Sequence, residues 1–252
     1  MLPEGDSMTR IFEANHYILI RSGYSDPAEH RHMAAHMVIS LSEAMTVYAG
    51  DTVLSCRGVM IPSGISHRID TRSRDTLVFL FAASSNIAAR IDAVRAVTDD
   101  VCAKVIGWYE RLEADGVRDY GCHEQELLSC LGMWECYCTV TDERILRAMD
   151  YIRSNASEKV TCRDVADHIY LSQDRFSHLF RQEVGMTYAA YVVCQRMMRV
   201  YADVFQGKSI TEAALAAGFS GSSHFADVNR RVFGMPIGKI MENAAFVKLR
   251  QQ

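Results

Sequence analysis

The sequence predicts an α+β, multidomain chain with an antiparallel β-barrel at the N-terminus, linker helices in the middle and an all-α domain at the C-terminus. Three observations predict this fold class. Short runs rich in Val, Ile, Tyr, Phe and Thr, broken by Gly, Pro, Ser and Asp, extend from residue 9 to residue 82. Apolar residues recur with a helical period of about 3.6 after residue 86. A segment that starts near residue 165 is repeated about 50 residues later.

Composition and charge favour more than one domain. The 252 residues are 49% hydrophobic, which is enough to bury a full core. Residues 1–141 hold 12 Lys and Arg against 19 Asp and Glu (net −7), whereas residues 142–252 hold 15 against 12 (net +3). The basic half therefore suits a polyanionic partner and the acidic half does not. The expected boundaries are 1–85 for the barrel, 86–141 for the linker helices and 142–252 for the C-terminal domain.

Targeting signals are absent from the sequence. No apolar run approaches the ~20 residues that cross a bilayer, so we expect no membrane span. The opening MLPEGDSMTR lacks the basic and apolar regions of a secretory signal. The eight cysteines are scattered through helical-looking segments and do not form a disulfide framework. We therefore expect a cytoplasmic protein with reduced thiols.

Three histidines lie close together in HRHMAAHMVIS, residues 30–40. On a β-strand, His30, His32 and His36 share one face because side chains alternate. A straight strand would still separate His32 from His36 by ~13 Å, which is too far for one shared ion. We therefore expect a bend at Met33-Ala34-Ala35. The alternative is a helix that starts at Asp26-Pro27 and stacks His32 and His36 one turn apart.

The same region resembles the cupin family of small β-barrels. The resemblance covers about residues 15–82 and rests on Gly58-x-x-x-Pro62-x-Gly64-x-x-His67, preceded by His30-x-His32-x-x-x-His36. Metal-binding cupins have a carboxylate where this chain has His36. The resemblance implies that one pocket is lined by His30, His32, His36 and His67. Four neutral imidazoles suit a divalent transition metal such as Zn, Ni, Cu or Fe. A metal-free pocket for a small organic effector and purely structural histidines are the other interpretations.

The middle of the chain is expected to be helical. One helix would run from Asn86 to about Leu112, with a shared apolar face made of Ile87, Ile91, Val94, Val97, Val101 and Val105. A second helix would span about Cys122 to Cys138. Both helices have more apolar surface than a small barrel covers, so we expect a homodimer formed through helices 86–138.

The repeated C-terminal unit carries the strongest signal. VADHIYLSQDRFSHLFRQEVG (165–185) aligns with AALAAGFSGSSHFADVNRRVFG (213–234), with one extra residue after the second turn. The alignment pairs Ala166 with Ala214, Leu171 with Phe219, Ser172 with Ser220, Phe176 with Phe225, and Gly185 with Gly234. A small Ala at a helix crossing, a short turn, a Ser expected as N-cap and an amphipathic helix are typical of a helix-turn-helix motif. Two such motifs on a rigid linker fit successive major grooves, about 34 Å apart.

This region resembles the DNA-binding domain of the AraC/XylS family of bacterial transcription regulators over about 100 residues. Matching residues include Asp164-Val165-Ala166, Leu171-Ser172, Gly185-Met186-Thr187, Ile210-Thr211-Glu212, Gly218-Phe219-Ser220 and Phe233-Gly234-Met235-Pro236. The resemblance implies binding to double-stranded DNA and contact with RNA polymerase. It assigns candidate DNA contacts to Gln173, Asp174, Ser177, His178 and Arg181 on the first recognition helix, and to Ser222, Ser223, His224, Asp227, Arg230 and Arg231 on the second.

Three residues of the second unit depart from the family pattern. Asn229 replaces a core Phe, Asp227 replaces a long polar or basic residue, and Ile237 replaces a frequent Pro. A buried Asn without a partner would cost about 1–3 kcal/mol, and Asp227 would repel phosphates unless it faces a cytosine. We therefore expect the first recognition helix to contribute more affinity than the second.

Together these features predict an effector-responsive transcription regulator, not an enzyme, that binds DNA as a homodimer. Activation and repression are both open. One competing hypothesis is a metal-dependent cupin enzyme, such as a dioxygenase, fused to a DNA-binding domain. Another is a DNA-binding protein whose barrel serves only to dimerise.

Overall fold

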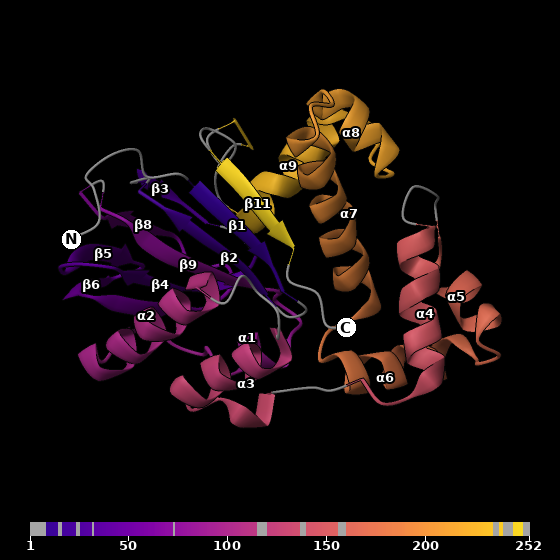
Figure 1. Ribbon diagram of the computed structural model, residues 1–252, viewed down its shortest axis with the longest axis horizontal. Helices are drawn as coiled ribbons and strands as arrows, with labels where there is room; N and C mark the ends of the chain where they lie inside the picture. The colour runs from indigo at the N-terminus through magenta and orange to yellow at the C-terminus, as the bar shows by residue number, and fades with distance from the viewer. Residues whose placement is uncertain are drawn as a thin grey trace.

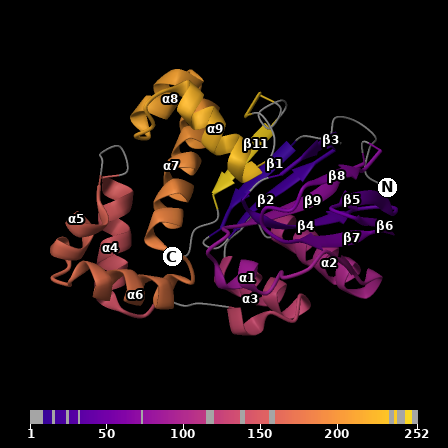
Figure 2. The same ribbon diagram turned by 180° about the vertical axis from the view of Figure 1, so that it is seen from behind.

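The structure, a computed structural model, describes residues 9–14, 17–23, 26–31, 33–72, 74–114, 120–136, 140–155, 160–233, 237–238 and 244–248. Figure 1 shows a β-rich N-terminal half beside a helical C-terminal half. The opposite view in Figure 2 shows the same two halves, with the last strand of the chain returning to the N-terminal sheet. Among the described helices, none is both long enough and apolar enough to span a bilayer.

The described strands form two sheets, of which the larger has seven strands in the order β10-β7-β4-β9-β2-β1-β11. These strands span Arg95–Val97 (β10), Gly58–Ile61 (β7), Ala35–Ser40 (β4), Thr76–Phe81 (β9), Tyr17–Ser22 (β2), Thr9–Glu13 (β1) and Ala244–Lys248 (β11). Strand β11 comes from the far end of the chain and pairs in parallel with β1. The other neighbours pair antiparallel.

The smaller sheet has four strands in the order β3-β8-β5-β6. They span Asp26–His30 (β3), His67–Asp70 (β8), Met45–Ala49 (β5) and Thr52–Cys56 (β6). Two turns contain glycines with positive φ: Gly50 (φ 55°) lies between β5 and β6, and Gly64 (φ 77°) lies between β7 and β8. Both positions need the left-handed backbone that Gly adopts without a Cβ penalty. Within the described residues the strands hydrogen-bond as two separate sheets, so closure into a barrel stays a prediction.

Both faces of the larger sheet are covered. Side chains alternate along β2, so Tyr17 and Leu19 join one core cluster while Ile18 and Ile20 join another on the opposite face. Near β4 and β7 that opposite face packs on the smaller sheet through a cluster that includes Val38, Val47, Val59, Ile61 and Ile69. Near β1 and β2 it packs on the C-terminal helices. The unbroken apolar run 17–20 is typical of a strand buried on both sides.

The predicted helix from Asn86 to Leu112 is wrong in its middle. The chain forms the short helix α1 (Asn86–Ala89), then edge strand β10, then α2 (Asp99–Ala114). Thr98 explains the second start, because its hydroxyl accepts a hydrogen bond from the Val101 N–H (3.4 Å) ahead of an acidic first turn. The second predicted helix ends early. Helix α3 (Tyr120–Cys130) stops before Gly132 (φ 64°), and a 3₁₀ turn, η1 (Trp134–Cys136), follows.

The apolar faces of α2 and α3 are buried inside the N-terminal half. They share a core cluster with the larger sheet through Val105, Trp108, Leu112, Leu127 and Leu128. Most of the apolar surface that predicted a dimer through helices 86–138 is therefore buried within the chain, while Trp134 is 53% exposed. Homodimer formation stays a prediction, now without that argument.

Within residues 143–233, the described part of the C-terminal half consists of helices joined by short turns. Its helices are α4 (Glu143–Ser154), α5 (Cys162–His168), α6 (Gln173–Val184), α7 (Tyr188–Phe205), α8 (Ile210–Ala216) and α9 (Ser222–Phe233). One core cluster joins α4, α5 and α6 to the start of α7, and another joins α8 and α9 to its end. Helix α7 has 18 residues and is therefore about 27 Å long. It connects two small helical units.

Hydrogen bonds and apolar packing join the two halves of the molecule. The Thr187 N–H donates to the Ser84 hydroxyl (3.2 Å) at the start of α7. The Met33 N–H donates to the Arg231 carbonyl (2.7 Å) near the end of α9. Between these points an apolar cluster brings together Ile11, Ile18, Ile20, Ala34 and Leu80 with Met197, Met198, Tyr201 and Phe225. The junction is therefore a packed interface that includes the bend next to the histidines.

Candidate functional sites

Each C-terminal helix pair contains the same hydrogen-bonded turn. In both turns one N–H donates a hydrogen bond to the carbonyl five residues earlier. The N–H of the preceding residue donates to the carbonyl three residues before it. The bonds are Leu171 to Ala166 (2.9 Å) and Tyr170 to Asp167 (3.1 Å) after α5, and Phe219 to Ala214 (3.0 Å) and Gly218 to Leu215 (3.1 Å) after α8. This pair of bonds is the Schellman motif, which ends a helix with one left-handed residue. The backbone thus repeats where the sequence repeats.

The first candidate recognition helix, α6, begins as predicted. Ser172 is its N-cap, and the Ser172 hydroxyl accepts a hydrogen bond from the Arg175 N–H (3.4 Å). Phe176 and Phe180 face the core. The side chains on the opposite face are exposed, and they include all five predicted contacts, Gln173, Asp174, Ser177, His178 and Arg181.

The second candidate recognition helix, α9, begins later than the alignment predicted. Helix α9 starts at Ser222, so Ser220 is not its N-cap. Instead the Ser220 N–H donates to His224 Nδ1 (3.3 Å), and the Ser220 hydroxyl lies 3.1 Å from the same nitrogen. The extra residue, Gly221, accounts for the shift. Of the predicted contacts, Ser222 is half-buried, and the exposed ones are Ser223, His224, Asp227, Arg230 and Arg231.

Charges on the two helices are placed similarly. Arg181 lies in the last turn of α6, and Arg230 and Arg231 lie in the last turn of α9. Asp174 lies in the first turn of α6, where a carboxylate interacts favourably with the helix dipole. The exposed guanidiniums are suited to phosphate contacts, since Arg binds phosphate with a fixed fork of donors.

Asn229 is buried, but it has a hydrogen-bond partner. Asn229 is 0% exposed, and its Oδ1 accepts a hydrogen bond from the Tyr201 hydroxyl (2.5 Å), which is equally buried on α7. Burial raises the pKa of Tyr201, which keeps the phenol protonated as a donor. The unpaired Asn considered from the sequence is therefore absent, and a polar pair ties α9 to α7. Ile237, which stands where the family frequently has Pro, is buried in the core cluster that also contains Tyr201.

Three of the four predicted pocket histidines meet between the two sheets. The ring centroids of His30 and His67 lie 4.4 Å apart, and those of His36 and His67 are also 4.4 Å apart. His36 is 2% exposed and His67 is 3% exposed, so water has little access to these rings. The fourth histidine, His32, lies outside the described residues.

The bend expected between the histidines is present. The chain bends at Met33 and Ala34, between the end of β3 and the start of β4. The alternative helix from Asp26 is wrong, because Asp26 and Pro27 begin strand β3. Pro27 is tolerated there since β3 is an edge strand of the smaller sheet.

The described histidines do not by themselves make a metal site. The His67 Nδ1–H donates a hydrogen bond to the Ile65 carbonyl (2.9 Å), which fixes the orientation and tautomer of this ring. Within the described part of the chain, no three His, Cys, Asp or Glu side chains are grouped so as to hold a metal ion. A metal site here would need His32, so metal binding stays a prediction.

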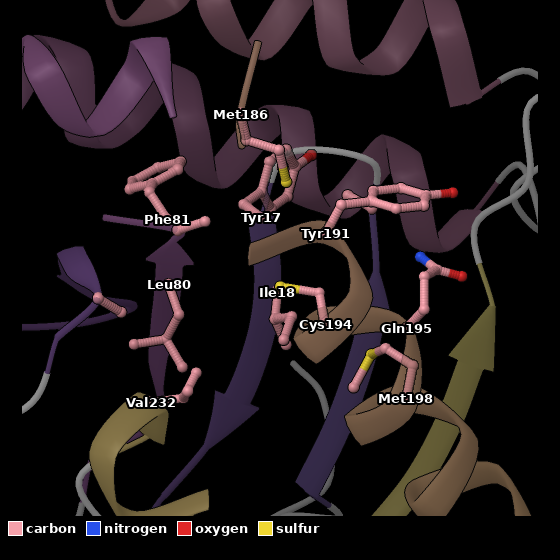
Figure 3. Close-up of a pocket in the computed structure, with 13 residues that line it drawn as sticks. Tyr17, Ile18, Leu80, Phe81, Met186, Tyr191, Cys194, Gln195, Met198 and Val232 are labelled. Atoms are coloured by element: carbon pink, nitrogen blue, oxygen red, sulfur yellow. The ribbon is translucent and has the colours of Figure 1, made fainter. Parts of the chain in front are cut away.

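A small apolar pocket lies at the junction of the two halves, and the sequence did not predict it. Its volume is about 40 Å³. Figure 3 shows β2 and β9 on one side and α7 on the other, with side chains from both turned toward the space between them. The lining includes Tyr17, Ile18, Leu80, Phe81, Met186, Tyr191, Cys194, Gln195, Met198 and Val232. The pocket is part of the interdomain packing, and its signal in the sequence was the unbroken apolar run of β2.

The histidine cluster and the junction are neighbours across the sheet. His36 on β4 pairs in register with Leu80 on β9, and Leu80 pairs with Ile18 on β2. Residues paired in register point to the same face. Leu80 and Ile18 line the junction pocket, so one row of side chains leads from His36 to α7.

The C-terminal part of the chain is similar in sequence to known proteins. Residues 165–243 match a family model described as a helix-turn-helix domain. The regulatory protein PocR of Salmonella typhimurium is 34% identical over 96 residues, which cover 38% of this chain and 32% of PocR. The HTH-type transcriptional activator RhaS of Yersinia pestis bv. Antiqua is 27% identical over 127 residues, which cover 48% of this chain and 46% of RhaS. The chain therefore spans less than half the length of either relative.

A solved structure resembles the arrangement of both halves. An apo ToxT variant from Vibrio cholerae matches 89% of this chain and 96% of its own chain, with a TM-score of 0.51 and 7% identity. At that identity the likeness is one of fold. The sequence matches identify residues 165–243 as a helix-turn-helix region and show that the C-terminal half is similar to parts of two proteins named as a regulatory protein and a transcriptional activator.

Proposed function

We propose that this protein is an effector-responsive, sequence-specific DNA-binding transcription regulator. The observation that carries the proposal is the repeated helix pair, in which the same Schellman turn precedes two helices whose candidate DNA contacts are exposed, apart from the half-buried Ser222. Both pairs lie within or at the edge of the matched helix-turn-helix region. PocR and RhaS are named as a regulatory protein and a transcriptional activator, and the enzyme alternative has no comparable support.

In this proposal α5–α6 and α8–α9 act as two helix-turn-helix motifs. Helix α7, about 27 Å long, connects the two motifs, and successive major grooves of DNA lie about 34 Å apart. The phosphate contacts would be Gln173, Arg181, Arg230 and Arg231. The base contacts would be Asp174, Ser177, His178, Ser222, Ser223, His224 and Asp227. The Asp227 carboxylate suits a cytosine amino group, while Ser and His side chains can hydrogen-bond to several base edges.

The N-terminal half would act as the sensor through its histidine cluster. A ligand that changes the packing of His36 acts on Leu80 through the register of β4 and β9. The same ligand acts on Met33, whose N–H holds the Arg231 carbonyl at the end of α9. A ligand with higher affinity for one arrangement of this junction enriches that arrangement. A homodimer and a contact with RNA polymerase complete the proposed regulator.

DNA binding can be tested with the full chain and a pool of random-sequence duplexes, followed by selection and fluorescence anisotropy. Arg181→Ala should lower the slope of log K against log salt by about 1, because one phosphate contact is lost. Arg147→Ala, an exposed arginine on α4, is the matched charge control and should leave the slope nearly unchanged. A wild-type chain with no measurable affinity for any duplex would refute the proposal.

Sensing can be tested by elemental analysis of the purified chain beside its His67→Ala variant. Stoichiometric Zn, Ni, Cu or Fe that disappears in the variant supports a metal-sensing pocket. A metal-free wild-type chain that gains no metal when each ion is supplied contradicts it. DNA affinity measured with and without the bound ion then tests the coupling, and equal affinities would exclude coupling through that ion.

A further inference from the structure

The turn of the first helix pair contains a residue that its backbone disfavours. Tyr170 occupies the left-handed position of the Schellman motif with φ 58°, and Gly218 occupies the same position of the second unit with φ 83°. A Cβ makes this conformation unfavourable, whereas Gly adopts it without a steric penalty. The same turn therefore contains a tyrosine in the first unit and a glycine in the second, and the backbone is strained at the tyrosine.

Packing does not account for the tyrosine. Its side chain is 89% exposed, which is the highest value among the exposed large hydrophobic residues of the described chain. The two hydrogen bonds of the turn come from backbone groups and would form equally with Gly at this position. The apolar residue that follows, Leu171, already packs against the core cluster of this unit. Tyr170 thus adds backbone strain through its Cβ without adding burial, and strained backbone positions are concentrated at functional sites.

The place of Tyr170 indicates what the phenol contacts. Only Leu171 and the N-cap Ser172 separate it from α6, and the N-terminal end of a recognition helix is the part that meets DNA. Phosphates are attracted to such a helix end by its free N–H groups and dipole. The other proposed phosphate contact at this end of α6 is the Gln173 amide, and Arg175 follows in the same turn. A tyrosine hydroxyl is a neutral donor that proteins use for phosphate oxygens, so Tyr170 can add a donor on the turn side of this helix end.

We propose that Tyr170 is a DNA-positioning residue whose hydroxyl donates a hydrogen bond to a backbone phosphate beside α6. The proposal rests on the proposed DNA-binding function and adds a contact outside the recognition helices. A phosphate contact carries no sequence information, so it should strengthen binding to every duplex by a similar factor. It fixes the depth and register of α6 in the groove and leaves base selection to the helix.

The test compares Tyr170→Phe and Tyr170→Gly in the full chain. DNA affinity is measured by anisotropy on a selected duplex and on a random duplex, and thermal unfolding is followed by circular dichroism. Tyr170→Phe should weaken binding to both duplexes about 5- to 10-fold, or about 1.0–1.4 kcal/mol, with an unchanged Tm. Tyr170→Gly should weaken binding at least as much, with an unchanged or higher Tm because the strain is removed. Tyr48→Phe, a hydroxyl removed from the N-terminal sheet, is the control and should bind as the wild type does.

Three outcomes would overturn the inference. If the Tyr170 variants bind as tightly as a wild-type chain that binds DNA, the phosphate contact does not exist, but the proposed function is unaffected. A loss confined to the selected duplex would indicate base recognition in place of a phosphate contact. A lower Tm in Tyr170→Gly would show that the phenol stabilises the fold. A wild-type chain that binds no duplex would remove the proposed function itself, which makes the two failures distinguishable.

Discussion

The bond between Tyr201 and Asn229 predicts a specific pattern of stability changes. Tyr201→Phe removes the hydroxyl that lies 2.5 Å from Asn229 Oδ1, and both side chains are 0% exposed, so water cannot replace it. A buried acceptor that loses its donor costs about 1–3 kcal/mol. Tyr201→Phe deletes one oxygen and leaves the ring in place, so no large cavity adds to this value. We expect the free energy of unfolding to fall by about 2 kcal/mol.

The complementary change and the double variant isolate the pair. Asn229→Leu keeps the branching of the side chain and removes the acceptor, so it should cost a similar amount as a single change. The double variant Tyr201→Phe/Asn229→Leu removes both partners of this bond, and such replacements can be nearly neutral. Its loss should be smaller than the sum of the single losses by about 1–2 kcal/mol.

Urea unfolding followed by circular dichroism measures these differences. For an m-value of about 2–3 kcal/mol/M, a loss of about 2 kcal/mol lowers the midpoint by about 0.7–1 M. The reasoning would be refuted by a wild-type midpoint in Tyr201→Phe. It would equally be refuted by single losses that add in the double variant, since additivity means that the two side chains do not interact.

Two other predictions concern packing at Gly58 and electrostatics at Glu183. Gly58→Ala should lower the free energy of unfolding by about 1–3 kcal/mol, because its Cβ would lie 2.5 Å from Cys102 Sγ. Cys102→Ala should recover part of that loss in a thermal melt, and Gly107→Ala, whose nearest neighbour is at 3.5 Å, should not be destabilising. Glu183→Gln should flatten the acid side of the stability profile, because hydrogen bonds from the Asp142 and Thr141 N–H groups lower the pKa of Glu183 below its ordinary 4.5. The folded pKa is the lower one, so this stabilisation is present above about pH 4.5 and is lost as the pH falls through the folded pKa. If the urea midpoints of the wild type and Glu183→Gln fall in parallel as the pH is lowered, this prediction is contradicted.

Helix ends could be predicted where one residue sets them locally. Ser172 follows a turn and precedes an amphipathic run, so its hydroxyl is placed for the first turn of α6. Thr98 has the same role before α2, but it lies among valines that fit a helical period. Val97 belongs instead to β10, which pairs with Gly58 on β7, almost forty residues away. Periodicity over so short a run does not distinguish a strand from a helix, and the partner strand is not visible locally.

The site could be predicted only as far as local geometry reaches. The alternation of side chains and the reach of a straight strand required a bend at Met33, and the bend is present. The contact of His30 with His67 depends on the pairing of β3 with β8, which only the folded sheet defines. The docking of α7 had a partial signal, because the continuous apolar run of β2 indicates two buried faces. It does not indicate that a helix from the C-terminal half covers one of them.

The attachment of α9 to the N-terminal half offers a route by which the proposed effector could act on DNA binding. Helix α9 has 12 residues and is about 18 Å long. Its last turn is fixed to the sensor through the Arg231 carbonyl, whereas Ser223 and Asp227 are exposed toward its first turns. A shift of about 1–2 Å at Met33, a typical size for allosteric helix movements, would displace Ser223 and Asp227 by a similar distance when α9 moves as a rigid body. Base-edge hydrogen bonds need donor–acceptor distances of about 2.7–3.2 Å, so a displacement of this size is enough to make or break them. The proposed effector would therefore act on the second recognition helix through its tethered end, without occupying any residue that faces DNA.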